Sequence, residues 1–576
     1  MRTIKYLLII TLISFLTVSC VVDTDLQEVP KDFQSPENSF VNKAGFESAL
    51  ADIYRTVRTD MYMPSDNVNN FSMLGIDIDF TAMRGDDISG VPQYNEMWFW
   101  NTFNKDNSFV GNWWQRYYNW IFKANVIIDR AEDENVNWTS EEEKNQIVGE
   151  AKFLRAFAYH FLANCWGDVP LVLNETNAPK FDYTRVPVQE VYQQCKADLT
   201  DAVKWMITVD KQPGGRAPRA AAYHLLSEVN ICLGDYQGAI DAASAVINDP
   251  NFSLMTERFG VRTDFTFNGY DYQGPQEPWG DVYWDLYQEG NMNWSEGNRE
   301  AIWNIEMDVK ILGGGNVTEW GGNFGLERHW CPNWWSAADK NGLSNWLKDT
   351  LCGRPVGSTY ASDYTGELIW QYKGDWDRDI RNSQYNIQRE MYWTNPNGEF
   401  YGQRMLPEHL GVPASYRKYT APSFKKATTT VHYGLYQDAA SGQNQDQGRV
   451  FKDWYIMRMP ETYLLRAEAY LRSGNQQKAA DDINVVRSRA HATPVNSSDV
   501  DIDLILDERA RELYIEEFRT STLMRMEKLV EYLMKYNGAV KQNGYQIPAY
   551  KNKFPIPQSE IEANKGAVLV QNPGYE

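Results

Sequence analysis

The sequence predicts a mainly α-helical protein, in which tetratricopeptide-like helical pairs form a scaffold and a large irregular, loop-rich portion binds ligand. Apolar and small residues recur at helical spacing in several long segments, and two of these segments share a plan of helix, Gly turn and helix. The stretch from about 250 to 450 lacks this period and is rich in Gly, Asn, Trp, Tyr and Pro. With 576 residues, 43% of them hydrophobic, the chain is long enough to bury a large core.

The N-terminus predicts a secretory leader. A short basic start precedes an apolar run from Tyr6 to Val18, which is too short to span a bilayer as a helix. The run ends in "LTVSC", residues 16–20, which resembles a bacterial lipoprotein signal. We therefore expect residues 1–19 to be a signal peptide and Cys20 to be acylated, which would anchor the protein durably. The alternative is a plain secretory signal in which the cysteine is incidental.

The segment "GEAKFLRAFAYHFLANCWGDVPLV", residues 149–172, predicts a helix that is buried on most of its circumference. Phe153, Phe157 and Phe161 recur every fourth residue, and alanines keep the remaining surface small. Gly167 stands where a helix is commonly ended by a residue with a positive φ. A densely packed helix with an abrupt end is expected here.

Further helices are expected in pairs. A helix within 187–210 follows the buried helix, and a long helix at 107–131 could pair with residues 40–58. Residues 220–248 and 461–490 each contain two amphipathic helices joined at a glycine, with alanines spaced along the second helix. This pattern is typical of tetratricopeptide-type pairs, which stack because neither helix can bury its apolar face alone.

The helical pairs divide the chain into regions. We expect a helical part at 20–250 with a loop insertion at 60–105, an irregular part at 251–450 and a helical end at 451–576. Twelve of the 21 tryptophans lie between Trp279 and Trp393. Long irregular segments that persist in a compact protein tend to be functional, so the irregular part is the expected ligand-binding surface.

Composition and motifs exclude several functions. A formal net charge of −21 argues against a nucleic-acid partner, because such binding depends on Lys and Arg. No closely spaced Cys or His residues support a zinc site, no cofactor motif is present, and no catalytic Ser elbow, phosphate loop or His-Glu-x-x-His helix occurs. Cys331 and Cys352 could form a disulfide, whereas Cys165, Cys195 and Cys232 lie in helical patterns and are expected to be buried thiols. We therefore expect a binding protein and no enzyme.

Five segments in order resemble the SusD/RagB family, the surface lipoproteins that cap TonB-dependent transporters in Bacteroidetes outer membranes. They are the 149–172 helix, "DLQEVP" with "NSFVNKAGFESALADIY" near the mature start, and residues 455–475, 505–525 and 554–575. The departures are Thr17 in the lipoprotein signal and Thr520 and Ser521, where members often continue Arg-Trp-x-Asp-Leu. The resemblance implies a lipid-anchored protein on the outer-membrane surface that binds glycans and delivers them to a SusC-like TonB-dependent transporter.

Other functions remain open at this point. Some members of the family bind peptides, and a helical-pair scaffold can also serve as a protein-interaction surface. A glycoside hydrolase needs two carboxylates across the scissile bond, and 77 acidic residues cannot discriminate for or against such a pair. In "ERARELYIEEFR", residues 508–519, the charges stand at helical spacings of three and four, so we interpret them as structural ion pairs.

The resemblance implies that ligand contacts come from two zones, residues 75–101 and the Trp-rich stretch after 270, which should converge at one face. Sugar rings stack on aromatic faces, and polar side chains bind their hydroxyl groups. Trp98 and Trp100 would face one way on an extended loop. The alternative is that any one of these tryptophans packs into the core of its own loop region and does not contact ligand. The candidates are Asp77 and Arg84 for hydroxyl groups, Trp98 and Trp100 for stacking, Asn101 beside them, and Trp284 and Trp320 as the second stacking surface.

Overall fold

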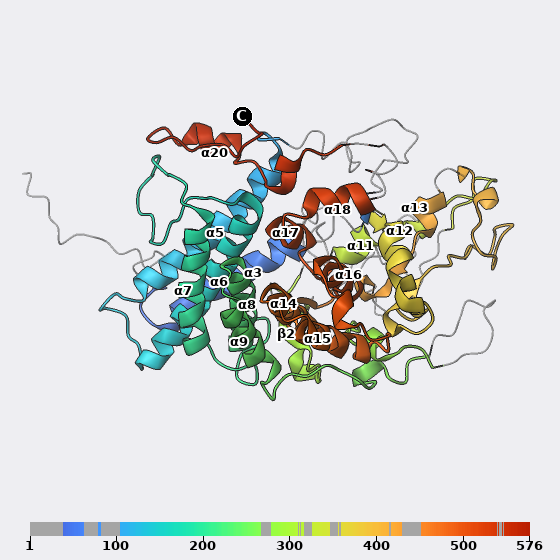
Figure 1. The fold of residues 1–576 in the computed structure, drawn as a ribbon, viewed down its shortest axis with the longest axis horizontal. Helices are drawn as coiled ribbons and strands as arrows, with labels where there is room; N and C mark the ends of the chain where they lie inside the picture. The colour runs from blue at the N-terminus through green and yellow to red at the C-terminus, as the bar shows by residue number, and fades with distance from the viewer. Residues whose placement is uncertain are drawn as a thin grey trace, which may run out of the picture.

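The computed structural model describes most of the chain outside its N-terminus and several internal segments. The described residues are 39–62, 79–81, 104–266, 278–308, 325–345, 359–413, 416–428, 451–537 and 546–576, with a few positions between 310 and 357 and between 540 and 544. The N-terminal helices lie at one end of the molecule, the helices within residues 459–536 lie in the middle, and the irregular part forms the other end (Figure 1).

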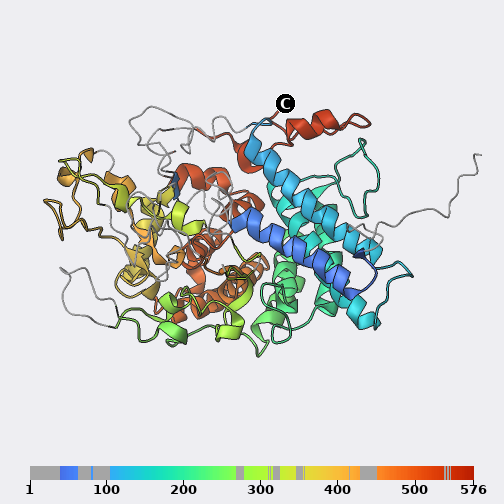
Figure 2. The same cartoon turned by 180° about the vertical axis from the view of Figure 1, so that it is seen from behind.

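The long helices pack on one another in a continuous row, and Figure 2 shows the first two of them side by side in blue and cyan. The four predicted helical pairs are confirmed. The last helix of the third pair also packs directly on the first helix of the fourth pair, although residues 248–458 separate them in sequence. In order, the row is α3 (Lys43–Tyr62), α5 (Ser108–Arg130), α6 (Glu141–Trp166), α7 (Val188–Trp205), α8 (Arg219–Cys232), α9 (Tyr236–Ile247), α14 (Met459–Arg472) and α15 (Gln476–Arg489).

Helix α6 is buried as its sequence predicts. Phe153, Phe157 and Phe161 are at most 2% exposed, and the rings of Phe157 and Phe161 meet edge to face at 5.0 Å. Four alanines of the same helix are completely buried, which lets α5 and α7 approach it closely. The helix ends at Gly167, whose φ of 79° is a conformation that residues with a side chain rarely adopt. The predicted end of this helix is confirmed.

The irregular part is built from short elements, as predicted, and short antiparallel strand pairs tie it together. Strand β2 (Ala301–Ile305) pairs with β6 (Trp454–Arg458), which leads directly into α14, and β4 (Ile387–Gln388) pairs with β5 (Ser423–Phe424). The other short elements of this part are η3 (Gly260–Arg262), α10 (Val282–Asp285), η4 (Trp294–Glu296), α11 (Leu326–Trp330), η5 (Trp334–Ser336), α12 (Asp363–Gly366), η6 (Leu368–Gly374), η7 (Ile380–Asn382), η8 (Pro407–His409), α13 (Tyr416–Thr420) and η10 (Lys425–Ala427).

After α15 the chain forms a further helical layer and an extended tail. Helix α16 packs on α14, and α17 packs on α6, so this layer closes the C-terminal side of the row. Its elements are η11 (Ser497–Asp499), α16 (Ile502–Leu513), α17 (Arg519–Arg525), α18 (Leu529–Tyr536), η12 (Ala549–Asn552) and α20 (Gln558–Ala563).

A buried network of ion pairs joins the irregular part to the helices. Glu508 of α16 lies 2.8 Å from Arg487 of α15 and 2.8 Å from Arg381 of η7. Burial alone would raise the pKa of Glu508, but Arg381, Arg487 and Arg511 outweigh it and hold the pKa at about 2. The predicted ion pairs are therefore confirmed. The pair of Arg511 with Glu508 has the expected helical spacing of three residues, whereas Arg381 and Arg487 pair with Glu508 from other elements.

The cysteines that the structure describes are free thiols. Cys165, Cys195 and Cys331 are completely buried, and Cys232 is partly buried. Burial raises the pKa of the Cys331 thiol to about 12, which keeps it protonated and unreactive. Cys331 is not in a disulfide in this structure, and Cys352 lies outside the described residues. Within the described ranges, no helix has both the length and the apolar character needed to cross a bilayer.

Candidate functional site

Most of the residues that the sequence predicts to contact the ligand lie outside the described part of the chain. These are Asp77, Arg84, Trp98, Trp100, Asn101 and Trp320, and the proposed lipidation site Cys20 lies outside it as well. Their roles stay predictions.

One strand pair connects the two zones in which these residues lie. Strand β1 (Asp79–Thr81) belongs to the first zone and pairs antiparallel with β3 (Thr359–Ala361) of the irregular part. The register places Phe80 opposite Tyr360. The backbone of the first zone therefore meets the irregular part at this point.

The structure corrects the expectation for Trp284. This residue lies in α10 and is 2% exposed, and its ring stacks on Phe265 at 5.6 Å. Arg258 covers the ring from 5.9 Å and pairs with Asp285 at 2.6 Å. A Cβ on Gly280 would approach the ring to 2.4 Å, so no space is left beside it. Trp284 fills the core of the irregular part, as do its neighbours Tyr283 and Leu286, and it offers no face to a ligand.

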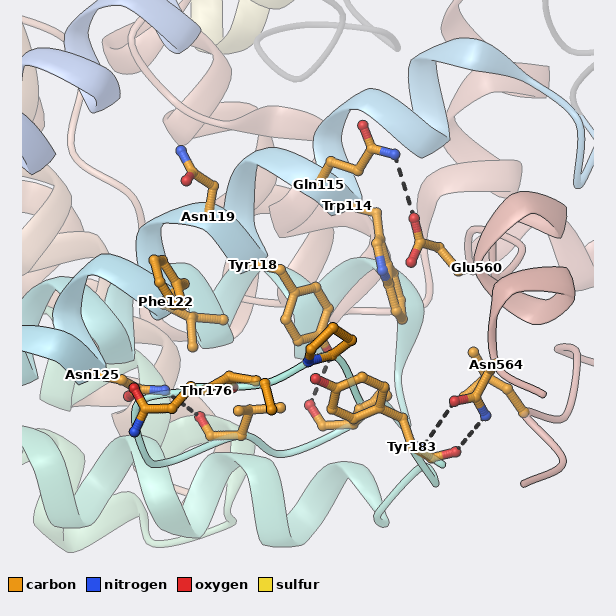
Figure 3. A pocket seen from close by; sticks show the side chains of 17 residues that line it. Trp114, Gln115, Tyr118, Asn119, Phe122, Asn125, Thr176, Tyr183, Glu560 and Asn564 are labelled. Carbon is orange, nitrogen blue, oxygen red and sulfur yellow. Dashed lines mark hydrogen bonds between the residues drawn. The ribbon is translucent and has the colours of Figure 1, made fainter. Parts of the chain in front are cut away.

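A cavity of about 670 Å³ lies between α5, the loop that follows α6 and the C-terminal segment, residues 558–576 (Figure 3). This volume is typical of small-molecule sites. The rings of Trp114, Tyr118 and Tyr183 gather at one end of the cavity, and Phe122 lies at the other end. The aromatic lining makes this cavity the candidate binding site that the described residues form.

Helix α5 supplies one wall because it carries apolar side chains on two faces. Trp113, Tyr117 and Trp120 are at most 1% exposed and pack into the core. Trp114, on the other face, is 4% exposed, and Phe122 is 46% exposed. A helix with one buried face usually presents polar residues on its opposite face, so the second apolar stripe is unusual.

The opposite wall is the loop of residues 168–187, which is anchored at both limbs. Its ends are joined where the Val186 N–H donates to the Val169 carbonyl at 3.0 Å. On the first limb, the Tyr118 hydroxyl donates to the Pro170 carbonyl at 2.7 Å, and burial raises the pKa of Tyr118 well above its usual value. The Asn125 amide donates to the Val172 carbonyl at 3.0 Å.

The second limb is held by the C-terminal segment. The Tyr183 N–H donates to the Asn564 Oδ1 at 2.8 Å, and the Asn564 amide donates back to the Tyr183 carbonyl at 2.8 Å. Arg185 donates to the Val570 carbonyl at 2.9 Å. Both limbs are therefore fixed, and the tip at 176–179 lies between them without a hydrogen bond to any residue that the structure describes.

The charge and polarity of the cavity suit a neutral ligand. Glu560 is the one ionisable carboxylate among its lining residues, and the Gln115 amide approaches it at 3.4 Å. Thr176, Asn177 and the Tyr183 hydroxyl line the cavity and make no side-chain hydrogen bond within the described part of the chain. Aromatic faces with a few free polar groups can bind amphipathic molecules.

Sequence reasoning missed this cavity, since it treated residues 107–131 only as a scaffold helix. A signal is present in the sequence: Trp114, Tyr118 and Phe122 recur every fourth residue beside a second apolar stripe. The covering loop and the C-terminal segment carry no comparable signal, because the contacts between them join residues almost 400 positions apart, as in the pair of Tyr183 and Asn564.

The described part of the chain is a helical-repeat row that carries an irregular part and an aromatic-lined cavity. A model of the SusD family matches residues 288–575, and a model described as starch-binding associating with outer membrane matches residues 31–231. The first match covers half of the chain, and this protein therefore belongs to the SusD family.

Relatives match over most of the chain. The SusD-like protein P2 of Formosa agariphila is 26% identical over 99% of this chain and 100% of its own length. The starch-binding protein SusD of Bacteroides thetaiotaomicron is 25% identical over 79% of this chain and 77% of its own length.

Solved structures share the fold. A laminarin binding SusD-like protein has a TM-score of 0.63 at 20% identity, and the match covers 93% of this chain and all of that one. NanU of B. fragilis has a TM-score of 0.65 at 21% identity, and the match covers 95% of this chain and all of that one. These likenesses confirm the predicted helical-repeat architecture.

Proposed function

We propose that this protein is a lipid-anchored component of the outer-membrane surface that binds a glycan and delivers it to a partner TonB-dependent transporter of the SusC type. The observation that carries the proposal is the match of the two family models, since one of them is described by starch binding and outer-membrane association. The names of two relatives, for starch and for laminarin, point to the same class of ligand.

The chemistry of the chain supports a glycan. The sequence contains 21 Trp and 34 Tyr residues, whose rings can stack on the apolar faces of sugars. We retain Trp98, Trp100 and Trp320 as stacking residues. Asp77, Arg84 and Asn101 complete the proposed site as partners for hydroxyl groups.

A glycan microarray tests the proposal. The soluble protein from residue 21 onward is applied to plant, host and microbial glycans, and we expect it to bind a defined class of polysaccharide. After long incubation the bound glycan should be recovered chemically unchanged, because we expect recognition without catalysis. Heat-unfolded protein is the control for adhesion through exposed aromatic residues.

Two outcomes would contradict the proposal. A blank array together with binding to a peptide mixture would favour the peptide-binding alternative. Release of shorter oligosaccharides that a single carboxylate-to-amide substitution abolishes would show that the protein is a glycoside hydrolase.

A further inference from the structure

We propose that the cavity between α5 and the 168–187 loop is a second sugar-binding site, which takes a neutral, linear oligosaccharide. This inference rests on the proposed function, because it assigns a further site for the same class of ligand. The cavity is built from α5, the 168–187 loop and the C-terminal segment, whereas the first proposed site belongs to residues 75–101 and the irregular part.

The shape of the site favours an elongated ligand. A second cavity of about 640 Å³ lies against the same loop and is lined entirely by residues 170–186. The two cavities share seven lining residues on both limbs and the tip of the loop, so they adjoin each other along it: Pro170, Val172, Thr176, Asn177, Ala178, Pro179 and Tyr183. In Figure 1 this loop is the open teal ring to the left of α5. A linear chain of sugar rings can extend from one cavity into the other, whereas a compact ligand would use only one.

The loop is suited to hold such a chain. Its limbs are fixed by α5 and by the C-terminal segment, so the walls of the site are formed before a ligand arrives. A preformed site avoids the entropic cost of ordering a loop on binding. The tip keeps its polar groups free for the ligand, because Thr176 and Asn177 make no side-chain hydrogen bond with residues that the structure describes.

The lining chemistry favours a sugar. Phe122 lines the cavity and is 46% exposed, so a sugar can reach its ring and stack on it. The free hydroxyl of Tyr183 and the amide of Asn177 can exchange hydrogen bonds with sugar hydroxyls. The larger cavity holds one carboxylate and no cation among its lining residues, and the adjoining cavity holds Glu175 and Asp182 against Lys180. Because carboxylates outnumber cations in both, a neutral sugar fits better than an anionic one.

The test uses variants at exposed positions that should fold normally. Phe122→Ala removes the stacking face, and Ala178→Trp places a bulky ring in the shared part of the two cavities. Val485→Ala, at a 38% exposed position on α15, is the matched control. All three are expected to melt within a few degrees of the wild type, because exposed positions contribute little to stability.

Each protein, as the soluble chain from residue 21, is titrated calorimetrically with maltohexaose, with laminarihexaose and with a hexasaccharide of any glycan that the microarray detects. The wild type and Val485→Ala should show two sites per chain. Ala178→Trp should lose the cavity site and retain the first proposed site with unchanged affinity. Phe122→Ala should keep both sites and weaken the cavity site about fivefold to tenfold, which is the range of one aromatic contact.

Each other outcome is decisive. If both variants titrate like the wild type, the cavity binds no sugar and the inference is wrong, while the proposed function stands. If the wild type binds no glycan at all, the proposed function and the inference of a second site are both wrong. If peptides of a casein digest bind and Ala178→Trp blocks them, the cavity is a peptide site and its assignment to sugars is wrong. A single sugar site that Ala178→Trp abolishes would support the cavity and contradict the roles of Trp98 and Trp320.

Discussion

At the scale of single residues, a tryptophan can bind a ligand only where its ring reaches solvent. Trp284 lies in the irregular part and is 2% exposed, whereas Phe122 lies in a long helix that buries its other face and is 46% exposed. The class of segment in which an aromatic residue lies therefore does not fix the exposure of its ring, because the segments that cover the ring can be distant in sequence.

For the proposed first site, Trp98→Ala and Trp320→Ala should each weaken glycan binding about tenfold, because each removes one stacking face. Calorimetry measures the affinity, and circular dichroism and the melting temperature should stay close to those of the wild type. Unchanged affinity, or an affinity that falls only together with the melting temperature, would place these residues in the core.

Trp284→Ala should act on stability instead. Removing a buried tryptophan leaves a large cavity, so we expect the free energy of unfolding to fall by about 3 to 5 kcal/mol. Chemical denaturation measures this loss. Phe122→Ala is the exposed control, with an expected loss of less than about 1 kcal/mol. Equal losses for the two variants would contradict the burial of Trp284.

At the scale of secondary-structure elements, the end of α6 depends on one glycine. Gly167 combines a φ of 79° with a ψ of −119°, and a Cβ added there would meet no atom within 4 Å. Gly167→Ala should therefore cost about 1 to 3 kcal/mol through backbone strain alone. Thermal or chemical denaturation measures the cost.

Gly111 is the matched control for this prediction. It lies inside α5, and an added Cβ would sit 4.0 Å from the Pro557 Cβ, which is an ordinary contact. Gly111→Ala should stabilise the protein by about 0.5 to 1 kcal/mol, because alanine is the better helix former. A destabilised Gly111→Ala variant, or a neutral Gly167→Ala variant, would contradict the backbone explanation.

Buried ion pairs hold the elements of the C-terminal part together. Arg458 of β6 is 1% exposed and lies within 2.8 Å of Glu300, Glu512 and Glu516. Arg458→Met should reduce the free energy of unfolding by about 3 to 5 kcal/mol, because it removes one buried cation from three buried carboxylates, which then share only Arg489, Arg381 and Lys426. Equilibrium denaturation at neutral pH measures this change.

An exposed pair provides the comparison. Lys144 lies 2.7 Å from Glu132, whose side chain is 66% exposed, so Lys144→Met should cost less than about 1 kcal/mol. If Arg458→Met were as mild as Lys144→Met, the network would not be needed to attach the irregular part to the helices.

At the scale of the whole molecule, the helical row is continuous although the chain leaves it for some two hundred residues. Helix α9 packs on α14, and the irregular part returns to the row through the pairing of β2 with β6. Both ends of the irregular part are therefore attached to the same scaffold, which can carry a long loop-rich segment without a separate domain.

The proposed lipid anchor at Cys20 would govern where this molecule resides. Cys20→Ala should release the protein from the outer membrane into the soluble periplasmic or secreted fraction, because acyl chains on Cys20 supply the proposed attachment. Cell fractionation with immunoblotting measures the distribution, and Cys232→Ala, which removes a partly buried thiol, is the control. A Cys20→Ala protein that still sediments with outer membranes would show that the attachment lies elsewhere.

Local patterns in the sequence determined the helices of this protein. The phenylalanine spacing of α6, the glycine that ends it and the four helical pairs are all encoded within short windows, because helical periodicity and end signals act over a few residues. The family resemblance also followed from short segments in order.

Tertiary packing alone decided that the ring of Trp284 is buried and where a cavity forms. Trp284 is enclosed by Phe265 and Arg258, and the cavity beside α5 exists because the 168–187 loop is fastened by Asn564. The physical reason is that the sequence of a helix with two apolar faces shows that both faces can be buried, but it does not show which segments bury them. The segments that cover them arrive from elsewhere in the chain, and their contacts leave no period in the sequence.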